Sequence, residues 1–330
     1  MSDQVESLLF AGATPWHGKG TYVGEEPILS NDVLQLAGLD WKVERVPLFV
    51  ETRTQDNTSL THDMVNGNFA IRRASDSKIL GIVGNRYREI QNETALSLMD
   101  SLVTIGQMRY HTAGSLFEGR KVWLLAQLPG VIEPVKGDAV GRFVLLCNTH
   151  DGTGSLKVFM TPIRVVCANT MTLAMNSREP GRTVSLQHSV NIMGKLEKAR
   201  EILGIAEKEY AAYGELMTAF AKVQIDEKKW DEFALHVLPD PVKLGASNLQ
   251  ASLRRTELRL LFENGIGQDI PGVAGTGWAA MNAVTQWVTH LAGANGSPEK
   301  RNENRFNSAI MGPNTLITNR AVSKLSSYVS

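Results

Sequence analysis

Four apolar segments that follow one another between Gln107 and Met175 constrain the fold of this chain most strongly. They are rich in Val, Leu and Phe, and short polar or Gly/Pro-containing breaks separate them, as expected of strands joined by turns. Strands connected in this way pair most simply as an antiparallel β-meander. The four predicted strands are Met108–Phe117, Arg120–Leu128, Gly141–Asn148 and Ser155–Val166.

Helical patterns flank the predicted meander on both sides. Apolar residues recur at three- and four-residue steps over Asn92–Ile105, and Asn92 itself has the chemistry of an N-cap. The segment Asn169–Asn176 has similar spacing and follows the last strand without a strong breaker. The central region therefore reads as a helix, a β-meander and a second helix.

The N-terminal part contains further strand patterns. A short helix is predicted over Ser30–Ala37, followed by a strand over Trp41–Thr54 in which Pro47 favours an edge position. The segments Phe69–Arg73 and Ile79–Val83 flank a turn and predict a hairpin.

The C-terminal half reads as mostly helical. In Ile192–Phe220, apolar residues alternate steps of four and three, a heptad-type seam that usually packs against another helix of the same chain or of a neighbouring subunit. This pattern predicts a homo-oligomer or an intramolecular bundle. The remaining segments are a strand at Thr183–Gln187, helices at Asp226–Leu238, Asn248–Phe262 and Trp278–Leu291, and a basic segment from Arg301 to Lys324.

These patterns indicate an α+β protein with three regions. Residues 1–90 form a β-rich N-terminal region, residues 91–190 the helix/β-meander/helix core, and residues 191–330 a helical region. Apolar residues make up 43% of the chain and charged residues 21%, a balance typical of globular proteins that argues against disorder.

Charge is distributed unevenly along a chain that is neutral overall. Residues 101–200 contain 12 Lys/Arg and 6 Asp/Glu, so this block is basic. Cations on adjacent strands can line a groove that tracks a phosphodiester backbone, with Tyr87, Tyr110, Phe117 or Trp123 available to stack on bases. Alternatively, the aromatic residues belong to the core and the cations to a solvated face. The candidate nucleic-acid-binding residues are Arg109, Arg120, Lys121, Arg142, Lys157, Arg164, Arg178 and Arg182.

No standard enzyme motif is present. The glycines at Gly265–Gly267 and Gly272–Gly277 lack the lysine and Ser/Thr of a phosphate loop, and no Cys/His array has zinc-site spacing. Cys147 and Cys167 lie in apolar runs, where free cysteine behaves as a small buried hydrophobe. We therefore predict no catalytic residue, no metal ligand and no cofactor.

A site assembled from distant histidines is the main alternative. His150 and Asp151, with His188 or His290, could form a metal or acid–base site once folded. The segment His150–Gly154 is explained more simply as a polar hairpin loop, because Asp and Gly supply turn geometry.

The sequence begins without a basic segment followed by a long apolar stretch. No apolar run reaches the ~20 residues that span a bilayer, so a cytoplasmic protein without a membrane partner is expected.

Several short motifs resemble the phage/plasmid-like protein family of unknown function. They are Pro15-Trp16-His17, Asn85-Arg86-Tyr87 with Gln91-Asn92, Gly114–Gly119 with Trp123, His150-Asp151-Gly152, Arg164–Thr170, and Asn282-Ala283-Val284 with His290. This resemblance implies a protein of phage, plasmid or related mobile DNA. The predicted order of helix, meander and helix is also similar, more distantly, to phage single-strand annealing proteins of the Rad/RecT type, which have a basic groove and assemble into rings or filaments.

Three classes of function follow. The first is a non-enzymatic protein of a mobile element that binds single-stranded DNA in recombination or replication, in the cytoplasm of the host cell. The second is an enzyme, metal-dependent or not, with a His/Asp site. The third is a structural or host-interaction protein whose helical seam drives assembly.

Overall fold

The computed structural model describes twelve segments of the chain. They are residues 8–10, 21–22, 29–53, 60–100, 103, 106–154, 156–164, 169–170, 183–186, 192–241, 249–292 and 314–329. The described elements form an α+β protein with a helical C-terminal half, which confirms the predicted fold class.

The chain divides into two compact units. Unit 1 consists of residues 1–127, 145–159 and 184–202, and unit 2 of residues 128–144, 160–183 and 203–330. The cuts pass through strands β7 (Lys121–Ile132), β8 (Val140–Thr149) and β9 (Leu156–Arg164) and helix α4 (Ile192–Lys222), so each unit contains part of these elements.

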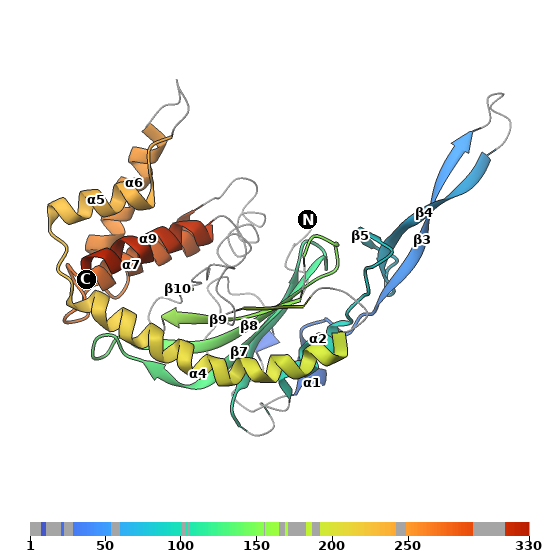
Figure 1. Cartoon of the computed structure of the whole chain (residues 1–330), viewed down its shortest axis with the longest axis horizontal. Coiled ribbons are helices and arrows are strands. Elements are labelled where there is room, and N and C mark those ends of the chain that lie inside the picture. Colours follow the sequence, from blue (N-terminus) through green and yellow to red (C-terminus); the bar gives the residue numbers. More distant parts are fainter. Residues whose placement is uncertain are drawn as a thin grey trace. The chain divides into compact units, whose positions relative to one another are not determined.

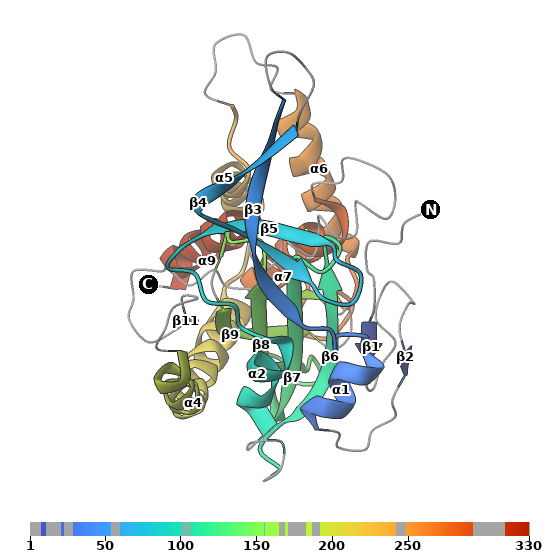
Figure 2. The same ribbon diagram turned by 90° about the vertical axis from the view of Figure 1, so that its right-hand side faces the viewer.

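The central sheet is the predicted meander. Its strands β6, β7, β8 and β9 are hydrogen-bonded neighbours in chain order (Figure 2). Beyond β6 the sheet continues into the short strands β1 and β2, while β10 and β11 both pair with β9. The bounds are β1 Leu8–Phe10, β2 Thr21–Tyr22, β6 Arg109–Leu116, β7 Lys121–Ile132, β8 Val140–Thr149, β9 Leu156–Arg164, β10 Asn169–Thr170 and β11 Thr183–Leu186.

Two helix predictions around the meander need correction. Asn169 and Thr170 belong to strand β10, which pairs with Arg164 and Ile163 of β9, so the helix predicted from Asn169 does not begin there. Residues 171–176 lie outside the described segments. The helix predicted from Asn92 exists as α2 (Asn92–Leu96), followed by the 3₁₀ turn η1 (Ser97–Met99), but its N-cap is Gln91.

A separate three-stranded sheet forms the rest of the N-terminal β structure in unit 1. Its order is β3 (Val43–Arg53), β4 (Leu60–Arg73), β5 (Ile79–Gly84), which confirms the predicted hairpin and the edge position of the Pro47 strand. Helix α1 (Ser30–Leu36) precedes it, as predicted. Strand β5 pairs only with residues Asn68–Arg72 of β4. The outer part of the β3–β4 hairpin, drawn in blue in Figure 1, is therefore a two-stranded ribbon.

Helix α4 (Ile192–Lys222) carries the predicted seam, and its described seam residues from Ala206 to Phe220 are buried. The sequence predicts another helix as the partner of this seam. At Tyr210 the partner is instead strand β8, because the Tyr210 hydroxyl bonds to both backbone groups of Phe143, donating to the carbonyl at 2.5 Å. A heptad pattern identifies the buried face of a helix without identifying what covers it.

The helices at Glu227–Val237, Leu249–Asn264 and Gly277–Gln286 agree with the sequence prediction, whereas the helix at Asn314–Val329 falls partly in the basic segment, for which no helix was predicted. Asp226 caps α5 by accepting a hydrogen bond from the Lys229 backbone N–H, and Thr276 caps α7 in the same way. No helix in the described segments is long and apolar enough to cross a membrane. The bounds are α5 Glu227–Val237, α6 Leu249–Asn264, α7 Gly277–Gln286, the π-helical turn η2 Trp287–Leu291, and α9 Asn314–Val329.

Candidate nucleic-acid interface

The four strands β6 to β9 contain no aspartate or glutamate. Each nevertheless carries at least one arginine or lysine, so every charged side chain contributed by these strands is a cation. A surface supplied with charge of one sign generates a field that attracts polyanions. The cations on the strands are Arg109, Lys121, Arg142, Lys157 and Arg164.

In unit 1, Arg109 and Lys121 share one face of the sheet. Arg109 lies opposite Gln127 in the β6–β7 ladder, and its Nε and Nη2 donate to Gln127 Oε1 at 2.9 and 2.7 Å. Lys121 and Gln127 are six residues apart on β7, and side chains an even number of positions apart point to the same face of a strand. Arg109 is exposed and Lys121 is half-buried.

Lys157 and Lys121 both lie close enough to Cys147 of β8 to influence its thiol. Burial raises the pKa of Cys147 to about 12, and the two lysines oppose this shift by smaller amounts. The thiol is therefore protonated and buried, as predicted for this cysteine. Cations from strands β6, β7 and β9 are thus present in the unit 1 part of the sheet.

His111 adds no positive charge to strand β6 at neutral pH. Burial, with a smaller contribution from Arg109, lowers its pKa to about 4. The positive charge of this region comes from arginine and lysine alone.

Arg120 follows an unusual turn between β6 and β7. Phe117, Glu118 and Gly119 have φ values of 54°, 60° and 87°, and left-handed backbone at a non-glycine residue costs about 1–3 kcal/mol. Glu118 is paired with Lys78 at 3.1 Å, and Lys121 Nζ lies 5.3 Å from the centre of the Phe117 ring. The Arg120 side chain that follows is exposed.

Arg142 differs from the other candidate cations because it is held within unit 2. Its guanidinium lies 5.0 Å from the centre of the Tyr210 ring of α4, and Nη1 donates to the Pro129 carbonyl at 3.1 Å. The arrangement fastens α4 to the sheet, which is a structural use of this arginine.

The remaining candidates are three arginines and four aromatic residues. Arg164 ends β9 and pairs with Asn169 of β10 in the backbone register. Arg178 and Arg182 lie outside the described segments. Of the aromatic candidates, Tyr110 and Trp123 are buried, while Phe117 and Tyr87 are partly exposed. Tyr87 donates its hydroxyl to the Thr149 carbonyl at 3.2 Å, so Phe117 is the candidate best placed to meet a base.

His150 is the largest departure from the sequence interpretation in unit 1. It lies in the β8–β9 turn as predicted, yet its side chain is fully buried. Its Nε2 is 2.9 Å from Asn92 Oδ1, and its ring meets the Trp41 ring edge-on at a centroid distance of 5.4 Å. A histidine enclosed in this way supports the packing of the turn.

The predicted His/Asp site can be examined as a metal site in the described segments. His188 lies outside them, and no group of three or more His, Cys, Asp or Glu side chains within them is arranged to hold a metal ion.

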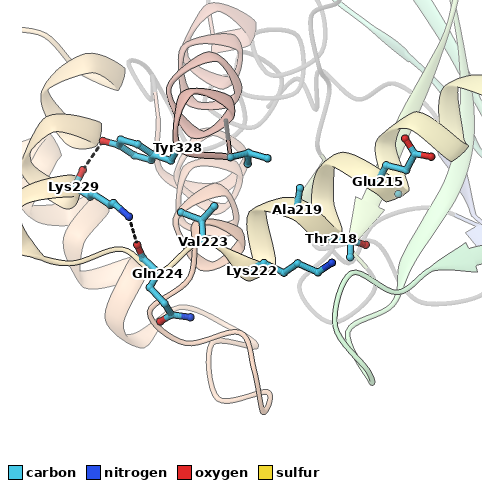
Figure 3. Close-up of a pocket in the computed structure, with 10 residues that line it drawn as sticks. Glu215, Thr218, Ala219, Lys222, Val223, Gln224, Lys229 and Tyr328 are labelled. Atoms are coloured by element: carbon cyan, nitrogen blue, oxygen red, sulfur yellow. Dashed lines mark hydrogen bonds between the residues drawn. The ribbon is translucent and has the colours of Figure 1, made fainter.

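A cleft of about 860 Å³ lies within unit 2 (Figure 3). It is formed by the end of α4, the start of α5 and the end of α9, and sequence patterns gave no sign of it. Lys229 Nζ donates to the Gln224 carbonyl at 3.1 Å, and the Tyr328 hydroxyl donates to the Lys229 carbonyl at 3.0 Å. The lining mixes Lys222 and Lys229 with Glu215, which gives no concentrated charge of either sign.

Fold and site together define an α+β protein whose central meander carries cations without carboxylates. The chain belongs to the family described as "Domain of unknown function (DUF932)", which matches residues 79–311, from β5 to beyond η2. No curated protein and no solved structure is detectably similar to the chain.

Proposed function

We propose that this protein binds single-stranded nucleic acid, without catalysis, through the cations of its central sheet. The observation that carries the proposal is the complete absence of carboxylates from strands β6 to β9, whose charged residues are all arginine or lysine. Sequence-independent phosphate contacts are made by arginine and lysine, and strands β6 to β9 supply these residues without carboxylates of their own, which supports the proposal.

The set of residues proposed to contact phosphates is the set expected from sequence without Arg142. Arg109, Arg120, Lys121 and Lys157 belong to the unit 1 part of the sheet and its β6–β7 turn, while Arg142 is assigned to packing on Tyr210. Phe117 supplies the stacking surface. Arg164, Arg178 and Arg182 stay in the proposal as further phosphate-binding residues.

The biological setting is proposed from resemblance. The phage/plasmid-like motifs favour a protein of mobile DNA, and the meander order favours a role like that of single-strand annealing proteins in recombination or replication. The cytoplasm of the host cell is the corresponding location.

The test is fluorescence anisotropy with a labelled single-stranded DNA of mixed sequence, titrated at several salt concentrations. The Lys121→Ala/Lys157→Ala variant is expected to bind more weakly, with the slope of log K against log salt reduced by about 0.7 for each phosphate that the variant no longer neutralises. Lys228→Ala on α5 is the matched control, because Lys228 is an exposed lysine in the other unit.

Two outcomes would overturn the proposal. One is the absence of binding to DNA and to RNA at low salt by the folded wild-type protein. The other is an equal loss of affinity in the sheet variant and in Lys228→Ala, because general charge rather than the sheet would then account for binding.

A further inference from the structure

The outer β3–β4 ribbon in unit 1 is exposed on both faces. Strand β5 stops pairing at Asn68, so residues 49–53 and 60–64 pair only with each other. Every one of these ten residues is exposed, and the apolar ones Phe49, Val50, Leu60 and Met64 keep 54%, 52%, 51% and 55% of their surface. A two-stranded hairpin is marginally stable in water, so exposed apolar residues on it point to a docking surface.

One face of the ribbon carries most of this apolar surface. In the β3–β4 register Phe49 lies opposite Met64, Glu51 opposite His62, and Arg53 opposite Leu60, and these three rows alternate with two rows that face the other way. Glu51 and His62 also form a contact of 3.8 Å between carboxylate and ring nitrogen. We call this face, with its rows Phe49/Met64, Glu51/His62 and Arg53/Leu60, the ribbon face.

The charges of the ribbon argue against a polyanion as its partner. Glu51 and Asp63 offset the charge of Arg53 within the ten residues, and His62 contacts the Glu51 carboxylate. Nucleic acid and anionic membrane surfaces select concentrated positive charge, which this ribbon lacks.

Pairing of another strand along the whole edge of β3 is also disfavoured. Pro47 has no N–H to donate, and the β3–β4 register shifts between Pro47 and Phe49. Proline and bulges at an edge strand hinder the addition of a further strand. The ribbon face is therefore a better docking surface than the full edge of β3.

The rows of the ribbon face are complementary to a second copy of the same face. A two-fold axis along the ribbon places β3 of one molecule over β4 of the other and keeps the rows aligned. Each Phe49 then meets a Met64, each Glu51 a His62, and each Arg53 the apolar surface of a Leu60. Thioether–aromatic contact and a carboxylate facing an imidazole N–H donor both favour this arrangement.

We propose that two copies of this chain associate through their ribbon faces, stacking two ribbons into a four-stranded sandwich. Stacked sheets lie about 10 Å apart, a spacing that phenylalanine and methionine side chains fill. Only six side chains per copy take part, fewer than the roughly 20–30 residues per partner of a standard interface, so the dimer is weak and concentration-dependent. This inference is independent of nucleic-acid binding.

Sedimentation velocity on the full chain measures the monomer–dimer equilibrium. Protein concentrations from about 2 to about 200 µM cover the dissociation constants expected of so small an interface. The wild-type protein is expected to shift from monomer to dimer across this range. Phe49→Ser/Met64→Ser is expected to raise the dimer dissociation constant at least about tenfold, because a few central apolar side chains supply most of the energy of an interface. Both residues are exposed, so the monomer keeps its fold, which circular dichroism verifies.

Ile82→Ser is the matched control, because Ile82 is 62% exposed on β5 of the same small sheet and lies away from the ribbon. It is expected to leave the dimer unchanged. A wild-type protein that stays monomeric at the highest concentration refutes the proposal, and a dimer that survives the double serine substitution places the interface elsewhere.

A mixing experiment tests the pairing of rows. His62→Glu sets two carboxylates against each other in a homodimer of that variant, and Glu51→Arg removes the carboxylate that faces His62, whereas a mixture pairs the new arginine with the new glutamate across the interface. Dimer formation restored only on mixing supports ribbon stacking, and equal dimerisation of each variant alone contradicts it.

Discussion

The Oδ1 atom of Asn92 lies 2.9 Å from Nε2 of His150, joining the first residue of α2 to the β8–β9 turn. Asn92 Nδ2 also donates to the Leu39 carbonyl at 2.9 Å, so one buried side chain connects three segments distant in sequence. Asn92 therefore ties the β8–β9 turn of unit 1 to α2 and to the segment at Leu39. The turn precedes β9, the strand that carries Lys157.

Replacing Asn92 by alanine is expected to destabilise the protein. The change removes both hydrogen bonds and leaves buried groups of Leu39 and His150 without this partner, a loss of about 2–4 kcal/mol in the free energy of unfolding. Urea denaturation measures it. Asn66→Ala is the control, since Asn66 is exposed on β4 and its replacement is expected to change stability by less than about 0.5 kcal/mol. An equal loss in the free energy of unfolding for Asn92→Ala and Asn66→Ala would show that the hydrogen bonds of Asn92 do not stabilise the fold.

Two glycines of strand β5 are expected to respond differently to alanine. A Cβ on Gly81 would lie 2.5 Å from backbone atoms of Asp151, whereas a Cβ on Gly84 would find its nearest neighbour at 4.0 Å. Gly81→Ala should therefore cost about 1–3 kcal/mol through forced displacement of the β8–β9 turn.

Gly84→Ala serves as the comparison and should be neutral or slightly stabilising, because alanine reduces the freedom of the unfolded chain. Thermal unfolding of both variants measures the difference. Similar melting temperatures would show that β5 and the turn are not in close contact.

The strands and helices of this fold were predicted better from the sequence than the tertiary contacts of individual side chains. Strands β6 to β9 follow from runs of Val, Leu and Phe bounded by turn residues, which are local signals. The burial of His150 depends on Trp41 and Asn92, which are remote in sequence, and the local string His150–Gly154 carries only turn chemistry. Asn169 has helical spacing with its neighbours, yet pairing with Arg164 makes it a strand residue.

The same limit applies to the candidate site. Composition alone predicted a basic sheet, but it could not separate Arg109 and Lys121 from Arg142. That distinction depends on Tyr210, which reaches Arg142 from a helix that begins far along the chain. The unit 2 cleft escaped prediction for the same reason, since three helices meet there.

Asp76 is expected to contribute acid-sensitive stability through Arg73. Hydrogen bonds from the Arg73 guanidinium lower the pKa of Asp76 from 3.8 to about 2, with smaller help from Lys78, and Arg73 itself is buried beside the Trp41 ring. Since the folded state holds the carboxylate ionised, this stability is complete above about pH 4 and is lost as pH falls toward 2.

In Asp76→Asn, the free energy of unfolding at pH 7 should fall by about 1 kcal/mol, because Arg73 loses its carboxylate partner at a site where solvent screens part of the interaction. The decline of stability between pH 4 and 2 should also become shallower than in the wild type. Urea midpoints at neutral and acid pH measure both effects. A pH profile of Asp76→Asn identical to that of the wild type would refute the assignment.

Arg142 and Lys121 are expected to differ in what their removal affects, although both are cations of the same sheet. Arg142→Ala removes the interaction with the Tyr210 ring and the hydrogen bond to Pro129, which should lower the free energy of unfolding by about 1–2 kcal/mol. Lys121→Ala should cost less stability, because Lys121 is half-buried at the first position of β7 and its ammonium lies near the ring of Phe117 in the adjacent turn, whereas Arg142 joins two distant elements.

Binding of single-stranded DNA should show the reverse order, with Lys121→Ala reducing the salt slope and Arg142→Ala leaving it unchanged under conditions where both variants are folded. Paired urea and anisotropy titrations on the two proteins measure both properties. A salt slope reduced in Arg142→Ala and unchanged in Lys121→Ala would contradict this assignment. Arg142 would then contact phosphate, and the phosphate-binding residues would include unit 2.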